Sequence, residues 1–180
     1  EIYAVRNDGF KYQELDLEVN DFIEEFPEKY DYGQAHDFCI ENIAMSGFWR
    51  LKKTGFSEIE GEENLIPDIT KWIDSTLLLS PRAHRFLADS LNKYGEFLPV
   101  VIGKETYQIF NCLTLVDVLE DKSSETNIIF NPESIGENLI FKTRFQHCFD
   151  LYCLPRFKVL IEELNLKGVV FDTHLGSFRE

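Results

Sequence analysis

The stretch TLLLSPRAHRFLADSLNKYGEFLPVVIGKETYQIFNCL, residues 76–113, contains strand, helix and strand signals in sequence order. Ser80 can cap the free backbone N–H groups at a helix start, and Pro81 loses no hydrogen bond at the next position. The apolar residues that follow recur on one helical face: Ala83, Phe86, Leu87, Leu91 and Tyr94. Because Gly95 can take the left-handed conformation that closes a helix, the stretch predicts a helix over residues 80–94.

Strand signals lie on both sides of this helix. The helix is preceded by the apolar residues 77–79 and followed by residues 97–102 and 107–113, which are rich in β-branched and aromatic side chains. The turn at residues 103–106 predicts that the last two strands form a hairpin. Further strands are predicted at residues 2–5, 15–19, 49–51, 116–119, 128–130, 139–141 and 149–154.

A second unit of the same kind lies near the end of the chain. Pro155 can open a helix over residues 155–164, which Gly168 closes before a strand at residues 169–171. Setting Pro81 over Pro155 aligns two strand–helix–strand units. Shared capping chemistry alone can produce such a match, but it supports a sheet that is covered by at least two helices.

The length and composition fit one folded domain. The chain has 180 residues, of which 44% are hydrophobic, and no apolar run approaches the roughly 20 residues that span a bilayer. We therefore expect a single α+β domain over residues 1–180, with a mostly antiparallel sheet and helices 80–94 and 155–164 packed on it. The four cysteines, at positions 39, 112, 148 and 153, lack zinc-type CxxC spacing, and we expect a reducing cytoplasm. Cys112 and Cys153 lie in apolar strand-like runs, which predicts that both are small buried hydrophobic residues.

The charge is unevenly distributed. The chain has 32 acidic and 18 basic residues, a net charge of −14. Residues 1–74 hold 18 acidic and 7 basic side chains, a balance of −11, and residues 75–180 hold 14 and 11, a balance of −3. Such a field repels nucleic acid and anionic membranes and attracts basic partners. The alternative interpretation is that the acidic residues only keep the protein soluble.

No motif for catalysis or metal binding is present. The sequence lacks Gly-x-Ser-x-Gly, a phosphate-binding glycine loop and His-Glu-x-x-His. His147-Cys148 with Cys153 differs in spacing from the usual metal sites, and the adjacent His36 and Asp37 do not face each other on a helix or strand. We therefore expect no catalytic activity, no obligatory metal and no cofactor.

A single basic cluster lies beside an aromatic residue in the acidic part of the chain. Arg50, Lys52 and Lys53 follow Trp49, as in some nucleic-acid-binding sites. Because three positive charges stand within a segment of net charge −11, we interpret them as internal ion-pair partners. The sequence therefore predicts no nucleic-acid binding.

Residues 76–172 resemble the immunity proteins of bacterial polymorphic toxin systems. The family is of the type described in genomes as a conserved domain of unknown function. The resemblance rests on Leu79-Ser80-Pro81-Arg82, Leu98-Pro99-Val100, residues 107–111, Val116-Asp117-Val118-Leu119, Ile140-Phe141-Lys142 and residues 157–171. Most of these are packing and capping positions, so no functional residue is carried over. Residues 1–75 lie outside the resemblance and form the acidic part.

The resemblance implies a cytoplasmic protein that binds a cognate toxin domain and blocks it. The charge suits a basic toxin such as a nuclease. The residues expected to bind the toxin are Asp16, Glu18, Asp21, Glu24 and Glu25, the loop carboxylates Glu58, Glu60, Glu62 and Glu63, and the aromatic anchors Tyr32 and Trp49. Two alternatives stay open: an enzyme with an unrecognised site, favoured if a pocket unites several polar groups, and a regulatory adaptor domain.

Overall fold

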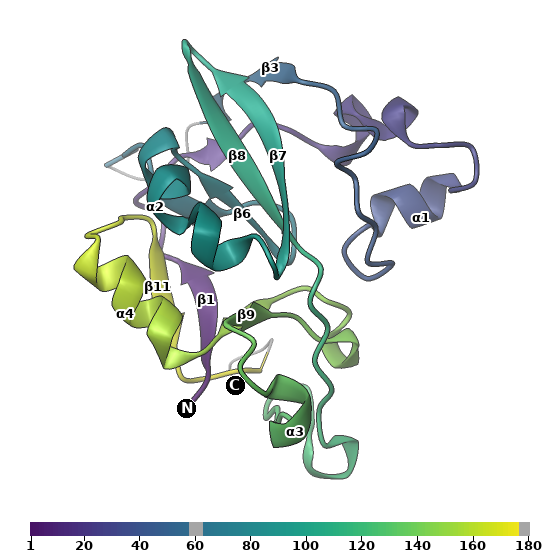
Figure 1. Ribbon diagram of the computed structural model, residues 1–180, viewed down its shortest axis with the longest axis vertical. Coiled ribbons are helices and arrows are strands. Elements are labelled where there is room, and N and C mark those ends of the chain that lie inside the picture. Colours follow the sequence, from purple (N-terminus) through teal and green to yellow (C-terminus); the bar gives the residue numbers. More distant parts are fainter. Residues whose placement is uncertain (58–62, 177–180) are drawn as a thin grey trace.

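The computed structural model describes residues 1–57 and 63–176, which form a single α+β domain (Figure 1). The strands form a five-stranded sheet, a four-stranded sheet and a two-stranded pair. Neighbouring strands are antiparallel in every named pair but one. The predicted fold class and the mostly antiparallel arrangement are therefore confirmed.

The five-stranded sheet has the order β3-β7-β8-β6-β5. Its strands are β3 (Lys52–Thr54), β5 (Ile69–Lys71), β6 (Thr76–Leu79), β7 (Gly95–Ile102) and β8 (Glu105–Cys112). Strands β7 and β8 form the predicted hairpin, in which Gly95 pairs with Cys112 and Ile102 with Glu105. Strand β3 pairs with β7 in parallel.

The four-stranded sheet has the order β11-β1-β10-β9. Its strands are β1 (Tyr3–Asn7), β9 (Ile140–Phe141), β10 (Leu151–Cys153) and β11 (Val169–Asp172). A separate pair joins β2 (Glu14–Leu15) to β4 (Phe56–Ser57). The two larger sheets meet where β1 and β11 lie beside β5.

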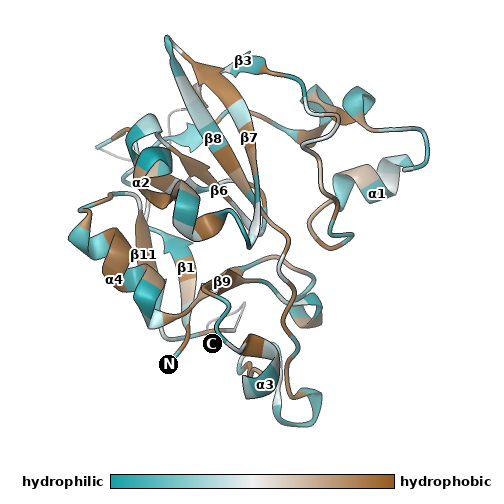
Figure 2. Ribbon diagram, viewed as in Figure 1, coloured by the Kyte–Doolittle hydropathy of each residue, from teal (hydrophilic) through white to brown (hydrophobic). Residues whose placement is uncertain are grey.

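The helices are α1 (Tyr32–His36), α2 (Pro81–Leu91), α3 (Pro132–Ile135) and α4 (Pro155–Glu163). Short 3-10 helices are η1 (Val19–Asp21), η2 (Ile23–Glu25), η3 (Glu120–Lys122) and η4 (Arg144–Gln146). Helices α2 and α4 lie next to each other (Figure 1). Hydrophobic and hydrophilic residues alternate along both helices (Figure 2). None of the helices in the described ranges has the length and hydropathy needed to cross a membrane.

The two strand–helix–strand units predicted from the prolines have the same topology. In the first unit, β6 and β7 flank α2 in sequence and both pair antiparallel with β8. In the second unit, β10 and β11 flank α4 and both pair antiparallel with β1. Each helix therefore connects two strands that are separated in the sheet by one antiparallel strand.

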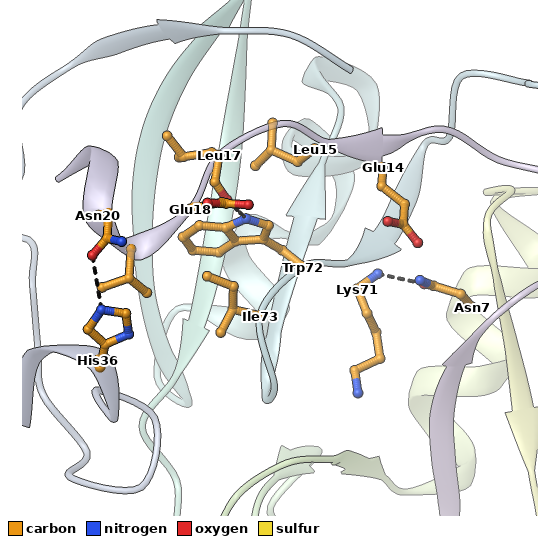
Figure 3. Close-up of a pocket in the computed structure, with 11 residues that line it drawn as sticks. Asn7, Glu14, Leu15, Leu17, Glu18, Asn20, His36, Lys71, Trp72 and Ile73 are labelled. Atoms are coloured by element: carbon orange, nitrogen blue, oxygen red, sulfur yellow. Dashed lines mark hydrogen bonds between the residues drawn. The ribbon is translucent and has the colours of Figure 1, made fainter. Parts of the chain in front are cut away.

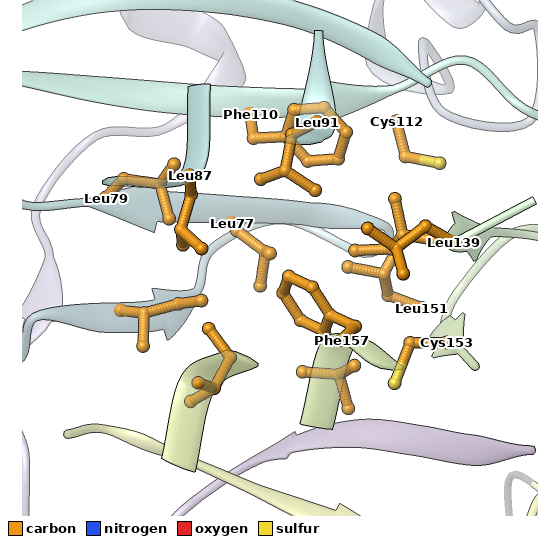
Figure 4. Close-up of a cluster of buried hydrophobic side chains, with 14 of the residues drawn as sticks. Leu77, Leu79, Leu87, Leu91, Phe110, Cys112, Leu139, Leu151, Cys153 and Phe157 are labelled. Atoms are coloured by element: carbon orange, nitrogen blue, oxygen red, sulfur yellow. The ribbon is translucent and has the colours of Figure 1, made fainter. Parts of the chain in front are cut away.

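The main core lies between the two helices and the sheets (Figure 4). Leu77 and Leu79 of β6 face the helices and pack with Leu87, Phe110 and Phe157, all fully buried. Leu78 points to the opposite face of the sheet, because side chains alternate along a strand. There it joins a second core that includes the buried residues Leu15, Leu17, Val19, Phe22, Phe38 and Met45. The N-terminal region therefore covers the face of the sheet that the helices leave open.

The end of α2 differs from the prediction. The helix ends at Leu91 rather than residue 94, and Gly95 does not take the left-handed conformation. Gly95 instead begins β7, where an added Cβ atom would lie 2.2 Å from the backbone oxygen of Asn111. A glycine is needed at this position because two strands approach closely, not because a helix closes.

Several predicted strands are shorter than expected or absent. Buried and exposed residues alternate from Leu15 to Val19 as predicted, but the hydrogen-bonded strand ends at Leu15. A 3-10 helix begins at Val19. Residues 49–51 form no strand, and residues 116–119 and 128–130 meet only through the isolated bridge between Val118 and Phe130. An apolar segment without enough partner backbone does not become a strand, whatever its composition.

Cys112 and Cys153 are buried free thiols, as predicted, and so are Cys39 and Cys148. Burial raises the pKa of the Cys39 thiol to about 11 and that of Cys112 to about 12. Both thiols therefore stay protonated at neutral pH and act as small apolar groups in the core.

Candidate functional site

Residues 14–21 form a row of exposed carboxylates that we call the acidic ridge. Leu15, Leu17 and Val19 are buried in the second core, so the side chains between them are directed to solvent. Those side chains are Glu14, Asp16 and Glu18, all exposed. At the end of the ridge, Glu18 and Asp21 form a capping box around η1. Apolar packing therefore holds several negative charges in a fixed row.

A groove of about 390 Å³ lies on one side of the ridge (Figure 3), and we call it the Trp72 groove. Its lining combines apolar and polar side chains from four parts of the chain. They are Asn7, Glu14, Leu15, Leu17, Glu18, Val19, Asn20, His36, Lys71, Trp72 and Ile73. The groove is thus assembled by tertiary packing between the ridge, α1 and β5.

Trp72 is fixed in this groove by a hydrogen bond and by aromatic neighbours. Its indole Nε1 donates to the backbone oxygen of Leu17 at 2.7 Å. Its ring lies 5.8 Å from that of Phe22 and 6.2 Å from that of Phe38, between ring centroids. These contacts tie the ridge to β5 and hold the indole in one orientation.

The end of the groove near α1 has a small polar cluster. Asn20 Oδ1 accepts a hydrogen bond from the Tyr32 hydroxyl at 3.1 Å, and His36 Nε2 lies 3.0 Å from the same oxygen. The rings of Tyr32 and His36 are 4.5 Å apart. Tyr32 is 64% exposed, so its contacts leave most of the ring accessible to a partner.

The other end of the groove contains Lys71, whose ammonium group is directed away from the ridge (Figure 3). Its Nζ lies 3.5 Å from Asp150 Oδ1 and donates to the backbone oxygen of Phe149 at 3.3 Å. Asp150 also pairs with Arg6 at 3.5 Å. Burial lowers the pKa of Lys71, and the attraction of Asp150 opposes that effect. The positive charge of Lys71 is therefore already engaged.

A second groove, of about 440 Å³, lies along Asp16 and Asp21. Lys52 and Lys53 also line this groove, so its lining holds two acidic and two basic residues. Lys52 Nζ also binds Glu25 at 3.0 Å and lies 3.4 Å from the centroid of the Trp49 ring. The interpretation of the basic cluster as internal ion-pair partners is confirmed for Lys52.

The structure gives the predicted toxin-binding residues different environments. Asp16, Glu18 and Asp21 come together on the ridge, and Glu24 is exposed just beyond it. The Glu25 side chain is only 11% exposed, and it also accepts a hydrogen bond from the Arg50 backbone N–H at 2.6 Å.

The remaining residues of this set are Trp49 and the loop carboxylates. Trp49 is partly buried, donates from Nε1 to the Pro99 backbone oxygen at 2.9 Å and packs 5.0 Å from Phe22. Of the loop carboxylates, Glu63 is exposed, and Glu58, Glu60 and Glu62 lie outside the described residues. Trp49 is therefore a packing residue of this protein's own core.

The sequence alone did not identify Glu14, His36, Lys71 or Trp72 as residues of a binding site, although all of them line the groove. Glu14 belongs to the same alternating pattern as Asp16 and Glu18, and that pattern could have included it. No spacing in the sequence links residues 14–20 with residues 71–73. Their proximity depends on the packing of Trp72 against the ridge, which is a tertiary contact.

Metal ligands do not cluster in the part of the chain that the structure describes: no three His, Cys, Asp or Glu side chains form a group that could hold an ion. Neither a scan against protein-family models nor a search of curated proteins gives a match. The fold and the grooves define an α+β protein with an acidic ridge that lines two polar grooves.

Proposed function

We propose that this protein is a cytoplasmic immunity protein, which binds and neutralises a cognate bacterial toxin domain. The toxin is a basic one, such as a nuclease, and the immunity protein blocks its active site or its substrate surface. The resemblance of residues 76–172 to immunity proteins supports the proposal. The observation that carries it is the acidic ridge, because its carboxylates lie together in the part of the chain with a net charge of −11.

A fixed row of carboxylates suits the recognition of a basic surface. Complementary charges raise the rate of encounter, and the effect is largest at low salt. Leu15, Leu17 and Val19 hold the row in place before binding, so little conformational entropy is lost when the partner docks. A nuclease presents a positively charged cleft built for phosphates, and an acidic ridge can occupy such a cleft.

The proposal predicts that the open reading frame next to this gene encodes a toxin with a C-terminal effector domain, and the test uses that domain. We expect its expression to arrest growth and co-expression of this protein to restore growth. The purified proteins should form a complex, and inhibition should be complete at an equimolar ratio. Persistent growth arrest, together with no complex in solution, would refute the proposal.

An enzyme is the second candidate, because several polar groups line one groove. Glu18, His36 and Lys71 all line the Trp72 groove, and several polar groups in one groove are a feature of active sites. The equimolar titration separates the two candidates. An enzyme that modifies the toxin would neutralise many toxin molecules per protein molecule. A stoichiometric inhibitor would neutralise no more than one toxin molecule per protein molecule.

A further inference from the structure

The two grooves beside the acidic ridge differ in their balance of charge. In the second groove, Asp16 and Asp21 share the lining with Lys52 and Lys53. In the Trp72 groove, Lys71 directs its ammonium group to Asp150. The negative charge that Glu14 and Glu18 bring to the Trp72 groove is therefore not countered by Lys71.

Glu14 and Glu18 contribute this negative charge. Among the residues that the structure describes, neither carboxylate forms an ion pair with a lysine, an arginine or a histidine. This is notable because Lys71 lines the same groove and engages Asp150 instead. Two carboxylates in one concave site favour the binding of a cation.

The aromatic side chain of the groove indicates which kind of cation fits best. The indole of Trp72 is held by its hydrogen bond to Leu17, and both Trp72 and Glu18 line the cavity. A guanidinium group stacks on aromatic faces and pairs with a carboxylate through two parallel hydrogen bonds, whereas an ammonium group is a compact, strongly hydrated charge. The combination of indole and carboxylates therefore matches arginine better than lysine.

The size of the groove sets the size of the occupant. Its volume of about 390 Å³ lies near the lower end of the roughly 300–1,000 Å³ of small-molecule sites. Such a space takes a single long side chain and not a folded segment. The apolar residues Leu15 and Ile73 can contact the methylene groups of that side chain.

We infer that the Trp72 groove is a receptor for an arginine side chain of the partner protein, with Glu14 and Glu18 as its anionic contacts and Trp72 as its aromatic wall. The identity of the partner as a toxin rests on the proposed function. The preference of the groove for a guanidinium group does not, and it can be measured on this protein alone.

The first experiment titrates the ¹⁵N-labelled protein with N-acetyl-arginine amide and follows the indole N–H signals by NMR. Trp72→Phe assigns the signal of Trp72, and the signal of Trp49 serves as an internal reference. We expect a saturable shift of the Trp72 signal with the arginine compound and none with the neutral isostere N-acetyl-citrulline amide. Equal shifts with the two compounds, or no saturable shift, would overturn the inference.

The second experiment compares two double variants that lose the same charge. Glu14→Gln/Glu18→Gln alters the groove, and Glu105→Gln/Glu125→Gln alters exposed carboxylates outside it. We expect the groove variant to bind the arginine compound about 10-fold more weakly and the control variant to bind it as the wild type does. Equal binding by the two variants would contradict the assignment of the carboxylates.

The same pair of variants separates this inference from the proposed function. If the groove variant dissociates from the toxin about 10-fold faster than the control variant, the groove holds a toxin arginine. If the wild type binds the toxin and the two variants dissociate alike, the inference is wrong and the immunity function stands. If the arginine compound binds as expected but no toxin complex forms, the groove assignment stands and the immunity function is wrong.

Discussion

Lys142 is a lysine with no exposed surface. It follows β9, and its Nζ donates to the backbone oxygen of Cys39 at 2.5 Å. Cys39 belongs to the N-terminal region that packs on the five-stranded sheet, whereas β9 belongs to the other sheet. A buried ammonium group is costly to desolvate, so its hydrogen bond to Cys39 is needed to offset part of that cost.

We expect Lys142→Ala to lower the free energy of unfolding by about 2–5 kcal/mol, because it leaves a cavity and an unpaired carbonyl group. Urea unfolding measures the change. Lys142→Met keeps most of the volume and removes the charge, so it should cost less than the alanine variant. An alanine variant as stable as the wild type would show that the bond to Cys39 is not needed.

Asp74 is a partly buried carboxyl group among other charges. Its burial raises its pKa above the ordinary value of 3.8. Lys71 and Lys142 act against this rise, whereas Asp150 and Asp37 add to it. A raised pKa means that the folded state binds the proton more tightly than the unfolded state does. The charged form of Asp74 therefore destabilises the folded protein at neutral pH.

Asp74→Asn should consequently be more stable than the wild type near neutral pH. Asn also tolerates the left-handed backbone at this position, where φ is 48°. As the pH falls through the pKa of folded Asp74, the wild type takes up a proton and recovers stability, and this recovery is complete below pH 3.8. Urea unfolding across pH tests the sign. A stability difference that grows on acidification would contradict it.

At the scale of elements, the starts of α2 and α4 and the end of α4 could be predicted to within one residue, but the end of α2 could not. The starts of α2 and α4 depend on local chemistry, namely Pro81 and Pro155 in the first turn. The end of α2 depends on where β7 begins, and Gly95 joins that strand because of its contact with Asn111. Such a contact spans two elements and leaves no signal in the local sequence.

The cap of α2 can be tested directly. Ser80 Oγ accepts a hydrogen bond from the Ala83 backbone N–H at 3.1 Å. We expect Ser80→Ala to lower the free energy of unfolding by about 1 kcal/mol, because an N–H group in the first turn loses its partner. Ser80→Thr keeps the hydroxyl group and should restore most of the loss. If both variants lose the same stability, packing around the nearly buried Ser80 matters and its hydroxyl group does not.

At the scale of the whole molecule, the sequence predicted part of the candidate site. Alternating hydrophobic and acidic residues indicated a surface with Asp16 and Glu18 on it, and the structure exposes both. The Trp72 groove could not be predicted, because it joins residues 14–20 to His36 and to residues 71–73. The periodicity of one segment shows which side chains face solvent, but not which distant segment lies beside them.

The proposed steering role of the ridge can be tested by reversing its charges. Asp16→Lys/Glu18→Lys/Glu24→Lys changes the net charge from −14 to −8, since each reversal adds two units. Exposed carboxylates contribute only about 0–1 kcal/mol each to a complex, so the loss of Asp16 and Glu24 should change dissociation little. The loss of Glu18, an anionic contact of the Trp72 groove, should make dissociation faster. Association with the toxin should slow about 10-fold at low salt, and its salt dependence should become flatter.

A control with the same net charge distinguishes the ridge from the charge of the protein as a whole. Glu105→Lys/Glu125→Lys/Glu163→Lys also gives −8 but alters exposed positions outside both grooves. Exposed charges that lie more than about 8–10 Å apart are largely screened at physiological salt, so only carboxylates near the contact should set the salt slope. If the two variants slow association equally, net charge alone steers the encounter and the ridge does not face the toxin. If only the ridge variant is slow, the acidic ridge is the docking surface.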